Sequence, residues 1–529
     1  MSGPTPMPQP AAQALADFET QGWRRLDPRM LAVHLVQEPI RFLPVLLGIF
    51  ILGSANDHQN SWWEYAALPA ILAFAVLRYL TTSYRISGGQ IELRKGLLTK
   101  QVIATPADRV RTVDVTSPPI HRILGLAKVE LGTAGAGKER ITLDSLRVDD
   151  ARHLREELIH LRNVTVPDVP PSGEPYAIDA PTRQPVDAEA TETTLLKLDP
   201  RWVRYAPVTM TGIVSALALF GFLNQFLTRI LERGVVSDAV DKIDEYSWWL
   251  DGLVLFLVLV ALVTALAMIG YVLQFWRFTL TRHSGGTLHV TRGLLTTRES
   301  SIEEKRIRGL EVGEPLGLRL FRGGRMHVVT TGLSKKEDRR GTAWLVPPAP
   351  RAVVERVASA VLDDQEALDA PLTQHGPAAL RRRWVRAIVP PVLFVLLFLG
   401  ATLLWHWPVV FLIASVTPLL VAPWLARDRY AGLGHHLTPT HLVVRSGSFV
   451  RRRDVLQRTG IIGWTVSSSW FQRRVGLTHL IATTAAGKQS YTAYDIDEGQ
   501  AVALAHQVDP ELVGQFLVPR ELPSDGHAG

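Results

Sequence analysis

The sequence predicts an α+β membrane protein in which six transmembrane helices form three hairpins, each followed by a small β-rich module with a C-terminal helix. Three observations carry this prediction. Long apolar stretches occur in pairs, basic residues gather at the outer ends of each pair, and one strand-rich segment recurs three times along the 529 residues. Hydrophobic residues make up 47% of the chain and charged residues 20%, so membrane segments are expected before any purely soluble fold.

Six apolar stretches are the candidates for membrane helices. They cover residues 41–55, 65–81, 206–228, 250–274, 387–404 and 408–425. A helix needs about 20 mostly apolar residues to cross a bilayer. The third and fourth stretches reach that length, whereas the first two are shorter and the first contains Pro44. A single short apolar run is more often a buried core helix, but the pairing of these runs favours membrane hairpins.

The distribution of charge predicts which side of the membrane the soluble parts face. Basic residues lie outside each pair, such as Arg24 and Arg25 before the first and Arg427 and Arg429 after the third, whereas residues 56–61 contain neither Lys nor Arg. The positive-inside rule therefore places both termini and all three modules on the cytoplasmic side of the cell membrane. The polar N-terminal stretch lacks the apolar core of a signal peptide, so no cleavage is expected.

Tryptophans mark the same boundaries. Pairs at residues 62–63 and 248–249 open the second helix of the first two hairpins, and Trp405 and Trp407 lie at the turn of the third. Tryptophan prefers the membrane–water interface because its ring is apolar and its N–H needs a partner. Equivalent placement in all three copies supports the predicted hairpins.

An internal repeat predicts the fold of the modules. When Gly96, Gly293 and Gly447 are set in register, each is preceded by a strand, a tight turn and a second strand. The segments are YRISGGQIELRKG (84–96), TRHSGGTLHVTRG (281–293) and HHLTPTHLVVRSG (435–447). Glycine pairs supply the positive φ of a two-residue hairpin in the first two copies, and Pro439-Thr440 requires a different turn in the third.

The repeat continues after each register glycine. Alternating apolar positions predict two more strands, and then a strand that ends in a small-residue turn. The last strands read VELGTAG (129–135), MHVVTTG (326–332) and LIATTAAG (480–487). Helices with one apolar face then close the copies at Asp149–Leu161, Pro348–Leu362 and Asp495–Val508. The segment upstream of the hairpins repeats as well, since the tetrapeptide LDPR at 26–29 recurs at 198–201.

These patterns divide the chain into alternating membrane and soluble segments. Transmembrane hairpins are expected at 41–82, 195–277 and 381–426, and the modules at 83–163, 278–363 and 427–517. A cytoplasmic N-terminal segment (1–40) and a tail (518–529) bound them. Residues 164–194 and 364–380 offer too little apolar surface to offset the entropy cost of ordering, so both are predicted to be flexible linkers.

The pattern resembles a known family. Membrane helix pairs that run into YRISGGQIELRKGLLTK, followed by PADRVRTVDV and GLAKVELGTAG, resemble the bacterial pleckstrin-homology-like (PH-like) multi-pass membrane proteins. The resemblance covers nearly the whole chain and is weaker in the third copy. It implies a partly open β-barrel of about seven strands with a C-terminal helix in each module. It implies no catalytic residues, and a role in cell-envelope maintenance or stress. Phosphoinositide binding is not carried over, because fold does not imply function.

The residues suggest no catalytic, cofactor or metal site. Cysteine is absent, which excludes disulfides, thiolate metal sites and cysteine nucleophiles. The glycine-rich stretch 132–138 lacks the spacing of a phosphate-binding loop. His435, His436 and His441 lie close together, but His441 aligns with Gln90 at a strand position, which favours a structural role over a metal site. Nucleic-acid binding would need a reading helix or a stacking platform, and the sequence predicts neither.

Repeated and clustered arginines are the candidate interaction residues. They are Arg109, Arg111, Arg306, Arg308, Arg451, Arg452 and Arg453. The plainer interpretation is that they maintain membrane topology and keep the strand edges in contact with water. The functional interpretation is attraction to anionic lipid, which contributes about 1 kcal/mol per basic residue at the surface.

The sequence therefore favours a non-enzymatic, membrane-anchored binding or scaffold protein. Its expected partners are membrane lipids and a protein, either a different one or another copy of this chain, and not nucleic acid. The alternative is a component of a transport or resistance system for membrane-active compounds. A coupled transporter would need ionisable residues inside its membrane helices, and the predicted helix interiors lack them. A membrane enzyme would need polar groups that converge in one cavity.

Overall fold

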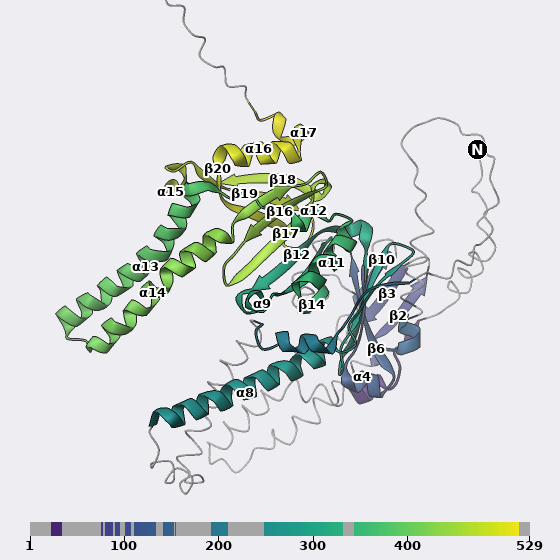
Figure 1. Ribbon diagram of the computed structural model, residues 1–529. Helices are drawn as coiled ribbons and strands as arrows, with labels where there is room; N and C mark the ends of the chain where they lie inside the picture. The colour runs from purple at the N-terminus through teal and green to yellow at the C-terminus, as the bar shows by residue number, and fades with distance from the viewer. Residues whose placement is uncertain are drawn as a thin grey trace, which may run out of the picture. The chain divides into compact units, whose positions relative to one another are not determined.

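The computed structural model describes residues 23–33, 73, 76, 77, 80, 81–133, 141–154, 192–209, 248–331 and 343–517. Within these ranges, residues 88–89, 96–100, 107–109 and 153 are not described. The chain splits into two compact units, each described here by itself. Unit 1 is Met1–Lys197 with Leu273–Glu303, and unit 2 is Leu198–Val272 with Glu304–Gly529. Figure 1 traces the elements of both units along the chain.

Unit 1 contains two antiparallel sheets, with the strand orders β1-β2-β3-β4 and β7-β6-β5-β11-β10-β9-β8. The strands are β1 (Arg24–Arg25), β2 (Ser83–Ser87), β3 (Gln90–Lys95), β4 (Gln101–Pro106), β5 (Val110–Ser117), β6 (Leu126–Thr133), β7 (Ile141–Arg147), β8 (Thr193–Lys197), β9 (Thr279–His283), β10 (Thr287–Arg292) and β11 (Thr297–Glu303). Alternating side chains such as Ile91, Val129 and Leu131 are fully buried and form the core of module 1.

Unit 2 contains two further sheets, with the orders β14-β13-β12-β17-β16-β15 and β18-β19-β20. The strands are β12 (Ile307–Pro315), β13 (Gly323–Thr330), β14 (Trp344–Pro350), β15 (Gly434–Leu437), β16 (His441–Ser446), β17 (Val450–Gln457), β18 (Ile461–Ser467), β19 (Leu477–Thr484) and β20 (Ser490–Asp497). Helix α16 (Glu498–Val508) lies along β18–β20 in Figure 1 and buries Leu504 against Leu480 and Ile496.

Neighbouring modules share their sheets. The second half of module 1, β5–β7, continues into the first half of module 2, β9–β11, through the pairing of β5 with β11. The second half of module 2, β12–β14, continues into the first half of module 3, β15–β17, through the pairing of β12 with β17. The register is the same at both joints, because Val113 opposes Ser301 and Leu310 opposes Val455 at corresponding positions of the repeat. The sequence predicted the strands of each module but not their pairing across modules.

The first strand of modules 1 and 2 comes from upstream of the predicted membrane hairpin. β1 pairs with β2, and β8 pairs with β9. With it, these modules have the strands β1–β7 and β8–β14, which matches the strand number implied by the family resemblance. The LDPR tetrapeptide follows directly, and its aspartates Asp27 and Asp199 accept hydrogen bonds from the backbone N–H groups of Arg29 and Arg201. Since β8 begins at Thr193, the predicted linker 164–194 extends too far.

Three helices in the described part of the chain are long and apolar enough to cross a membrane. They are α8 (Trp248–Phe275), α13 (Gly376–Trp405) and α14 (Val409–Ala431). They confirm the predicted stretches 250–274, 387–404 and 408–425 as helices. The stretch 41–55 lies outside the described residues, as do most of 65–81 and all of 206–228 after residue 209, so six membrane helices remain a prediction. Figure 1 shows α13 and α14 as an antiparallel hairpin.

The second predicted linker, 364–380, is ordered, contrary to the prediction. It contains α12 (Glu366–Asp369) and the first residues of α13. Asp364 accepts hydrogen bonds from Thr440 Oγ1 at 2.7 Å and Thr438 Oγ1 at 3.1 Å, and its Oδ2 lies 2.8 Å from His441 Nδ1. These long-range partners supply the order that composition did not indicate, and they give His441 a structural partner.

The predicted closing helices are present, and those of modules 2 and 3 start later than predicted. α11 (Arg351–Leu362) closes module 2 and α16 closes module 3, while the helix of module 1 begins at residue 148 and is described as far as residue 154. Helices at Pro348 and Asp495 were predicted too early, because residues 348–350 and 495–497 end the strands β14 and β20. Apolar spacing alone does not distinguish the last strand residues from the first helical turn.

Candidate functional site

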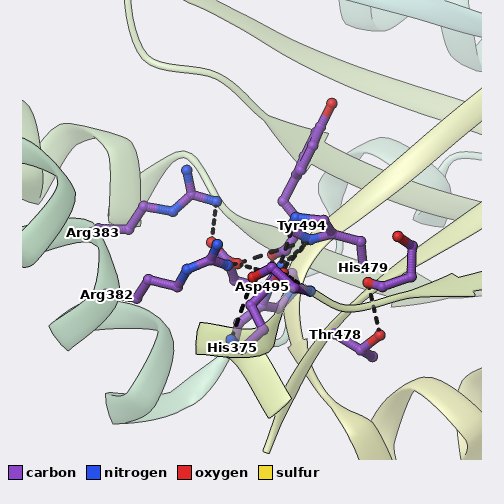
Figure 2. Close-up of polar contacts among 10 residues, drawn as sticks. His375, Arg382, Arg383, Thr478, His479, Tyr494 and Asp495 are labelled. Atoms are coloured by element: carbon purple, nitrogen blue, oxygen red, sulfur yellow. Dashed lines mark hydrogen bonds and ion pairs between the residues drawn. The ribbon is translucent and has the colours of Figure 1, made fainter. Parts of the chain in front are cut away.

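Asp495 is the centre of a buried polar cluster in unit 2 (Figure 2). It lies near the end of β20, is fully buried, and has a positive φ of 56°. A positive φ is unfavourable for a residue with a side chain, and a buried carboxylate is costly unless it is paired and hydrogen-bonded. Specific partners must therefore offset both costs.

Two arginines and a glutamine supply these partners. Arg382 and Arg383 point from the start of α13 toward the carboxylate in Figure 2. Arg382 pairs with Oδ1, and Arg383 Nη2 lies 2.5 Å from Oδ2. Gln472, in the short helix α15 (Trp470–Arg473), donates a hydrogen bond from Nε2 to Oδ1 at 2.9 Å. A capping box with Ser469 fixes the start of α15. One carboxylate thus joins β20, α15 and α13.

Three histidines extend the cluster. His375 Nδ1 lies 2.7 Å from the carbonyl oxygen of Tyr494, and His375 Nε2 lies 3.1 Å from His435 Nδ1. The backbone N–H of Asp495 donates to His479 Nδ1 at 3.1 Å. Burial lowers the pKa of His375, and it lowers that of His435 to about 4, so both rings are neutral near pH 7. The histidines bind backbone and one another as neutral rings, while the arginines carry the counter-charge.

This arrangement is suited to anchoring. Removing one partner of a buried ion pair costs about 3–5 kcal/mol, because the remaining charge stays buried without compensation. The Arg382 and Arg383 side chains are mostly buried, so their pairing with Asp495 is not a solvent-screened surface contact. The cluster therefore holds module 3 to the end of a helix that is apolar enough to cross the membrane.

Asp428 forms a second junction in unit 2, near the end of α14. Its Oδ1 accepts hydrogen bonds from Arg319 Nη2 at 2.6 Å and Arg451 Nη2 at 3.1 Å, and its Oδ2 accepts one from Ser448 Oγ at 2.6 Å. Arg319 belongs to the short helix α9 (Leu316–Leu320) and Arg451 to β17. The end of α14 is thereby tied to parts of modules 2 and 3.

A short helix with outward-facing apolar residues occurs at the same place in every module. α4 (Pro119–Ile123), α9 and α15 follow β5, β12 and β18. Each buries its third residue, which is His121, Leu318 or Gln472. The apolar side chains that it exposes include Ile123 (84% exposed), Leu320 (73%), Phe321 just after α9 (62%), Trp470 (52%) and Phe471 (71%). Such exposure is unusual for large apolar groups in water and marks a contact surface.

Each short helix also lies close to the module-side end of a candidate membrane helix. Arg122 of α4 donates to the carbonyl oxygen of Leu294, and Leu294 donates its N–H to the carbonyl oxygen of Leu273 in α8. α9 reaches α14 through Arg319 and Asp428, and α15 reaches α13 through Gln472 and Asp495. The exposed apolar residues therefore lie near the module-side ends of helices that are apolar enough to cross a membrane.

A basic pocket opens beside α9 in unit 2. It has a volume of about 630 Å³ and is lined by four arginines, two glutamates and the aromatic residues Tyr205 and Phe321. The charged residues are Arg204, Arg319, Arg322, Arg351, Glu314 and Glu355. Arg351 Nε donates to Glu355 at 2.6 Å and Arg319 pairs with Asp428, which leaves Arg204 and Arg322 against Glu314. The excess of arginine makes the pocket suitable for an anion.

The joint between β12 and β17 contains a charged cluster. Glu311 lies directly opposite Asp454, with Lys488 Nζ at 2.5 Å and Arg452 Nε at 3.4 Å from the Glu311 carboxylate. Burial, and then repulsion from Glu311, raise the pKa of Asp454 to about 7. The two modules are therefore joined by charge pairing in addition to the backbone ladder.

The predicted interaction residues that the structure describes do not form one site. Arg109 and the side chain of Arg111 lie outside the described residues. Arg308 donates to Gln457 Oε1 at 3.3 Å, and the Arg306 carbonyl oxygen accepts a hydrogen bond from Thr330 Oγ1. Arg451, Arg452 and Arg453 are consecutive in β17 but contact Asp428, Glu311 and the carbonyl oxygen of Leu368. These three arginines support contacts within unit 2.

Sequence reasoning missed the two carboxylates that organise these junctions. Asp428 lies between Arg427 and Arg429, where it looked like part of an interfacial charge run. Asp495 was taken for the first residue of a helix. The available signal for Asp495 was the run Arg381–Arg383 at the start of a membrane helix, which a buried acid elsewhere in the chain could neutralise.

Comparison with known proteins agrees with this architecture. The family described as "Bacterial PH domain" matches residues 38–162, 218–365 and 390–511. The chain is 20% identical over 334 residues to the UPF0699 transmembrane protein YdbT of Bacillus subtilis (strain 168); the alignment covers 61% of this chain and 66% of that relative, just under two thirds of its length. No solved structure matches the chain. Since the three family matches together span more than half of the 529 residues, the chain belongs to the bacterial PH domain family and is a membrane protein with three copies of that domain.

Proposed function

We propose that the protein is a membrane-anchored, non-enzymatic scaffold in the cell envelope, in which successive PH-like modules present binding surfaces beside the membrane. The observation that carries this proposal is the sharing of sheets, β5 with β11 and β12 with β17, in one register. Modules that act independently are normally joined by flexible linkers with few crossing contacts. Backbone pairing between modules instead suits a protein whose task is to hold surfaces in a fixed order.

We also infer that the modules face the cytoplasm. Arg382 and Arg383 at the start of α13, and Arg427 and Arg429 at the end of α14, lie at the module-side ends of one hairpin, whose turn at Trp405–Trp407 carries only His406 as an ionisable group. Basic residues are retained on the cytoplasmic side of membrane helices. A cysteine introduced at the turn would be labelled from outside the cell, and one introduced in α16 would not.

Membrane lipid is the first partner that we propose. The short helices combine exposed aromatic or aliphatic side chains with arginines, as in Phe471 beside Arg473 and Arg474. This combination suits the headgroup region of an anionic bilayer, which accepts apolar rings and attracts basic residues. The basic pocket beside α9 could take an anionic headgroup at the same level. The second partner is a protein, bound by the module surfaces.

Site-specific photo-crosslinking in cells tests the scaffold role. A photoreactive residue is placed on the exposed face of module 3 at Ala503, on the edge strands at Val102 or Ile462, and, as a lipid-facing control, at Leu404 of α13. The module positions are expected to yield discrete protein adducts, whereas Leu404 should yield lipid adducts. If every module position yields only lipid or no adduct, the scaffold proposal is wrong and the membrane helices become the functional part.

A further inference from the structure

The two ends of the repeat expose strand edges that the inner copies keep paired. Among the described strands, none pairs with the outer edge of β4 or with that of β18. By position in the repeat, β4 corresponds to β11 and β17, and β18 corresponds to β5 and β12. The inner strands pair with each other, β5 with β11 and β12 with β17. β4 and β18 are therefore the two halves of one more joint of the same kind.

The exposure of side chains marks the missing partner. Val466 of β18 is 52% exposed, whereas its counterparts Val115 and Val312, at the two inner joints, are 5% and 6% exposed. Ile462 of β18 and Val102 of β4 are exposed as well, at 63% and 55%. Apolar residues on an open edge favour association with another strand.

These edges also lack charged residues, and their one proline, Pro106, is the last residue of β4. β4 reads QVIATP and β18 reads IIGWTVS, with no charged residue in either. The other outer strands carry charge, carry proline or are covered: β1 has two arginines, β7 and β20 have aspartates, β8 has a lysine, β14 has three prolines, and β15 is covered by the bridge from Thr373. Terminal copies of a repeat are normally the most polar at their outer face. Here the edges at the two ends of the array are neutral.

We infer that β18 of one copy of this protein pairs, antiparallel, with β4 of a second copy and continues the sheet sharing between chains. The inference rests on the proposed scaffold role and names its protein partner as the same chain. The register follows from the inner joints. Val113 opposes Ser301 and Leu310 opposes Val455, so Trp464 is expected opposite Ala104. Two residues further along β18, Val466 then lies opposite Val102.

A second copy is a better occupant than an unrelated strand, because the two edges fit each other. Trp464 follows the bulge at Ile461/Gly463 as Val113 and Leu310 follow theirs, and Ala104 lies at the same distance from its register glycine as Ser301 and Val455. The position that carries Glu311 and Asp454 at one inner joint is filled by Thr465 and Ile103 at the ends, so no buried charge needs a partner. Two different surfaces meeting in this way form a heterologous contact, which produces rows or closed rings of copies in the membrane.

Cysteine crosslinking tests the pairing directly, because the full chain has no native cysteine. Two differently tagged full-length copies are co-expressed, one with Val102→Cys and one with Val466→Cys, and membranes are oxidised. Directly opposed residues in an antiparallel pair have Cα atoms about 4.5–5.5 Å apart, which is within disulfide range. A product that carries both tags is expected. As a positive control, Val115→Cys with Glu299→Cys in one chain reports the equivalent inner pair.

The register is tested by moving one cysteine by one residue. Ile103→Cys with Val466→Cys should give at least tenfold less product, because neighbouring residues of a strand face opposite sides. Products of Val102→Cys with itself, or of Val466→Cys with itself, would indicate a two-fold contact and overturn the inference. So would the absence of any mixed product while the inner control pair forms.

Co-purification of two tagged copies supplies a second readout. Ile462→Lys with Val466→Lys places charges on exposed side chains, so folding should be retained while recovery of the second copy falls at least tenfold. Lys substitutions at Ala503 and Gln507 of α16, also exposed, should leave recovery unchanged. If photo-crosslinking from the modules captures other proteins while copies neither crosslink nor co-purify, self-association is wrong and the scaffold proposal stands.

Discussion

At the scale of single residues, two carboxylates, one buried and one partly buried, hold the modules to the candidate membrane helices. Asp495 takes two arginines from the start of α13, and Asp428 of α14 takes Arg319 and Arg451 from unit 2 strands and helices. Arginine suits this task because its planar guanidinium keeps its charge and forms several hydrogen bonds at once. Arginines at the start of a candidate membrane helix therefore also stabilise the fold.

Replacing Asp495 with Asn is expected to loosen module 3 from α13. The amide keeps the size of the side chain but leaves Arg382 and Arg383 without a counter-ion, at a cost of about 3–5 kcal/mol. Hydrogen exchange in β20 and the first turns of α13 should become faster in the lipid-reconstituted chain. Asp497→Asn is the matched control, because Asp497 only caps α16 and Asn caps a helix equally well. Equal exchange in both variants would contradict the anchoring role.

The pair His375 and His435 is expected to make the same junction sensitive to acid. Burial lowers the pKa of both rings below the ordinary 6.5, that of His435 to about 4. A detached or unfolded junction then binds more protons than the folded one, so stability is lost as the pH falls from about 6.5 towards 4. Exchange of β15 amides, corrected for intrinsic rates, should rise over that window. His435→Asn keeps a donor near Nδ1 without titrating and should flatten the dependence. An unchanged slope would assign the effect to another group.

The contacts between individual residues could not be predicted from the sequence. The contact between Arg382 and Asp495 spans 113 positions, and no local pattern distinguishes an arginine that binds a buried acid from one that faces solvent. The three arginines of β17 looked like one basic cluster. Alternation along the strand, together with different neighbours, sends them to three separate partners.

At the scale of elements, α15 is expected to lie in the headgroup layer. Its counterparts α4 and α9 keep Ile123, Leu320 and Phe321 exposed although the next module is already docked beside them, so docking does not account for the apolar surface. A polarity-sensitive label on Phe471→Cys should be quenched by brominated lipid in anionic vesicles. The label on Gln507→Cys in α16 serves as the reference.

The basic residues of α15 should determine its lipid preference. Arg473→Gln with Arg474→Gln is expected to reduce quenching at position 471 in anionic vesicles and to leave it nearly unchanged in zwitterionic ones, because each basic residue contributes about 1 kcal/mol only where the surface is anionic. A label at position 471 that responds like the one at 507 in every vesicle would place α15 in water.

Element types were largely predictable, whereas element membership was not. Glycine pairs, alternation and apolar helices fixed most of the strands and three of the membrane-spanning candidates, because these signals are local. The strands β1 and β8 were missed because they are short and because they precede the predicted membrane hairpins. The rest of the module that each strand completes follows the hairpin. A linker was predicted at 364–380 because the partners that order it, such as Thr440 and His441, are supplied by the third module.

At the scale of the whole molecule, the repeat is not a set of separate domains. A sequence repeat shows that one unit is copied, but the same strands can close within a copy or pair with the next copy. At both inner joints the strands pair with the next copy, and both joints have the same register. The alternating pattern permits this pairing but does not specify it. The PH-like module was therefore predictable as a list of strands, and its boundaries in space were not.

Removal of residues 364–529 tests this interdependence within one chain. The truncated protein keeps β12 but loses β17, so β12 becomes an open edge and loses the charge cluster of Glu311 with Lys488. Its amides should exchange at least about 100-fold faster, since a factor of ten corresponds to about 1.4 kcal/mol and several ladder hydrogen bonds are lost. The amides of β5 should stay protected, because β11 remains in place. Unchanged exchange in β12 would mean that the modules fold independently, whereas equal loss in β5 would mean that the array unfolds as one unit.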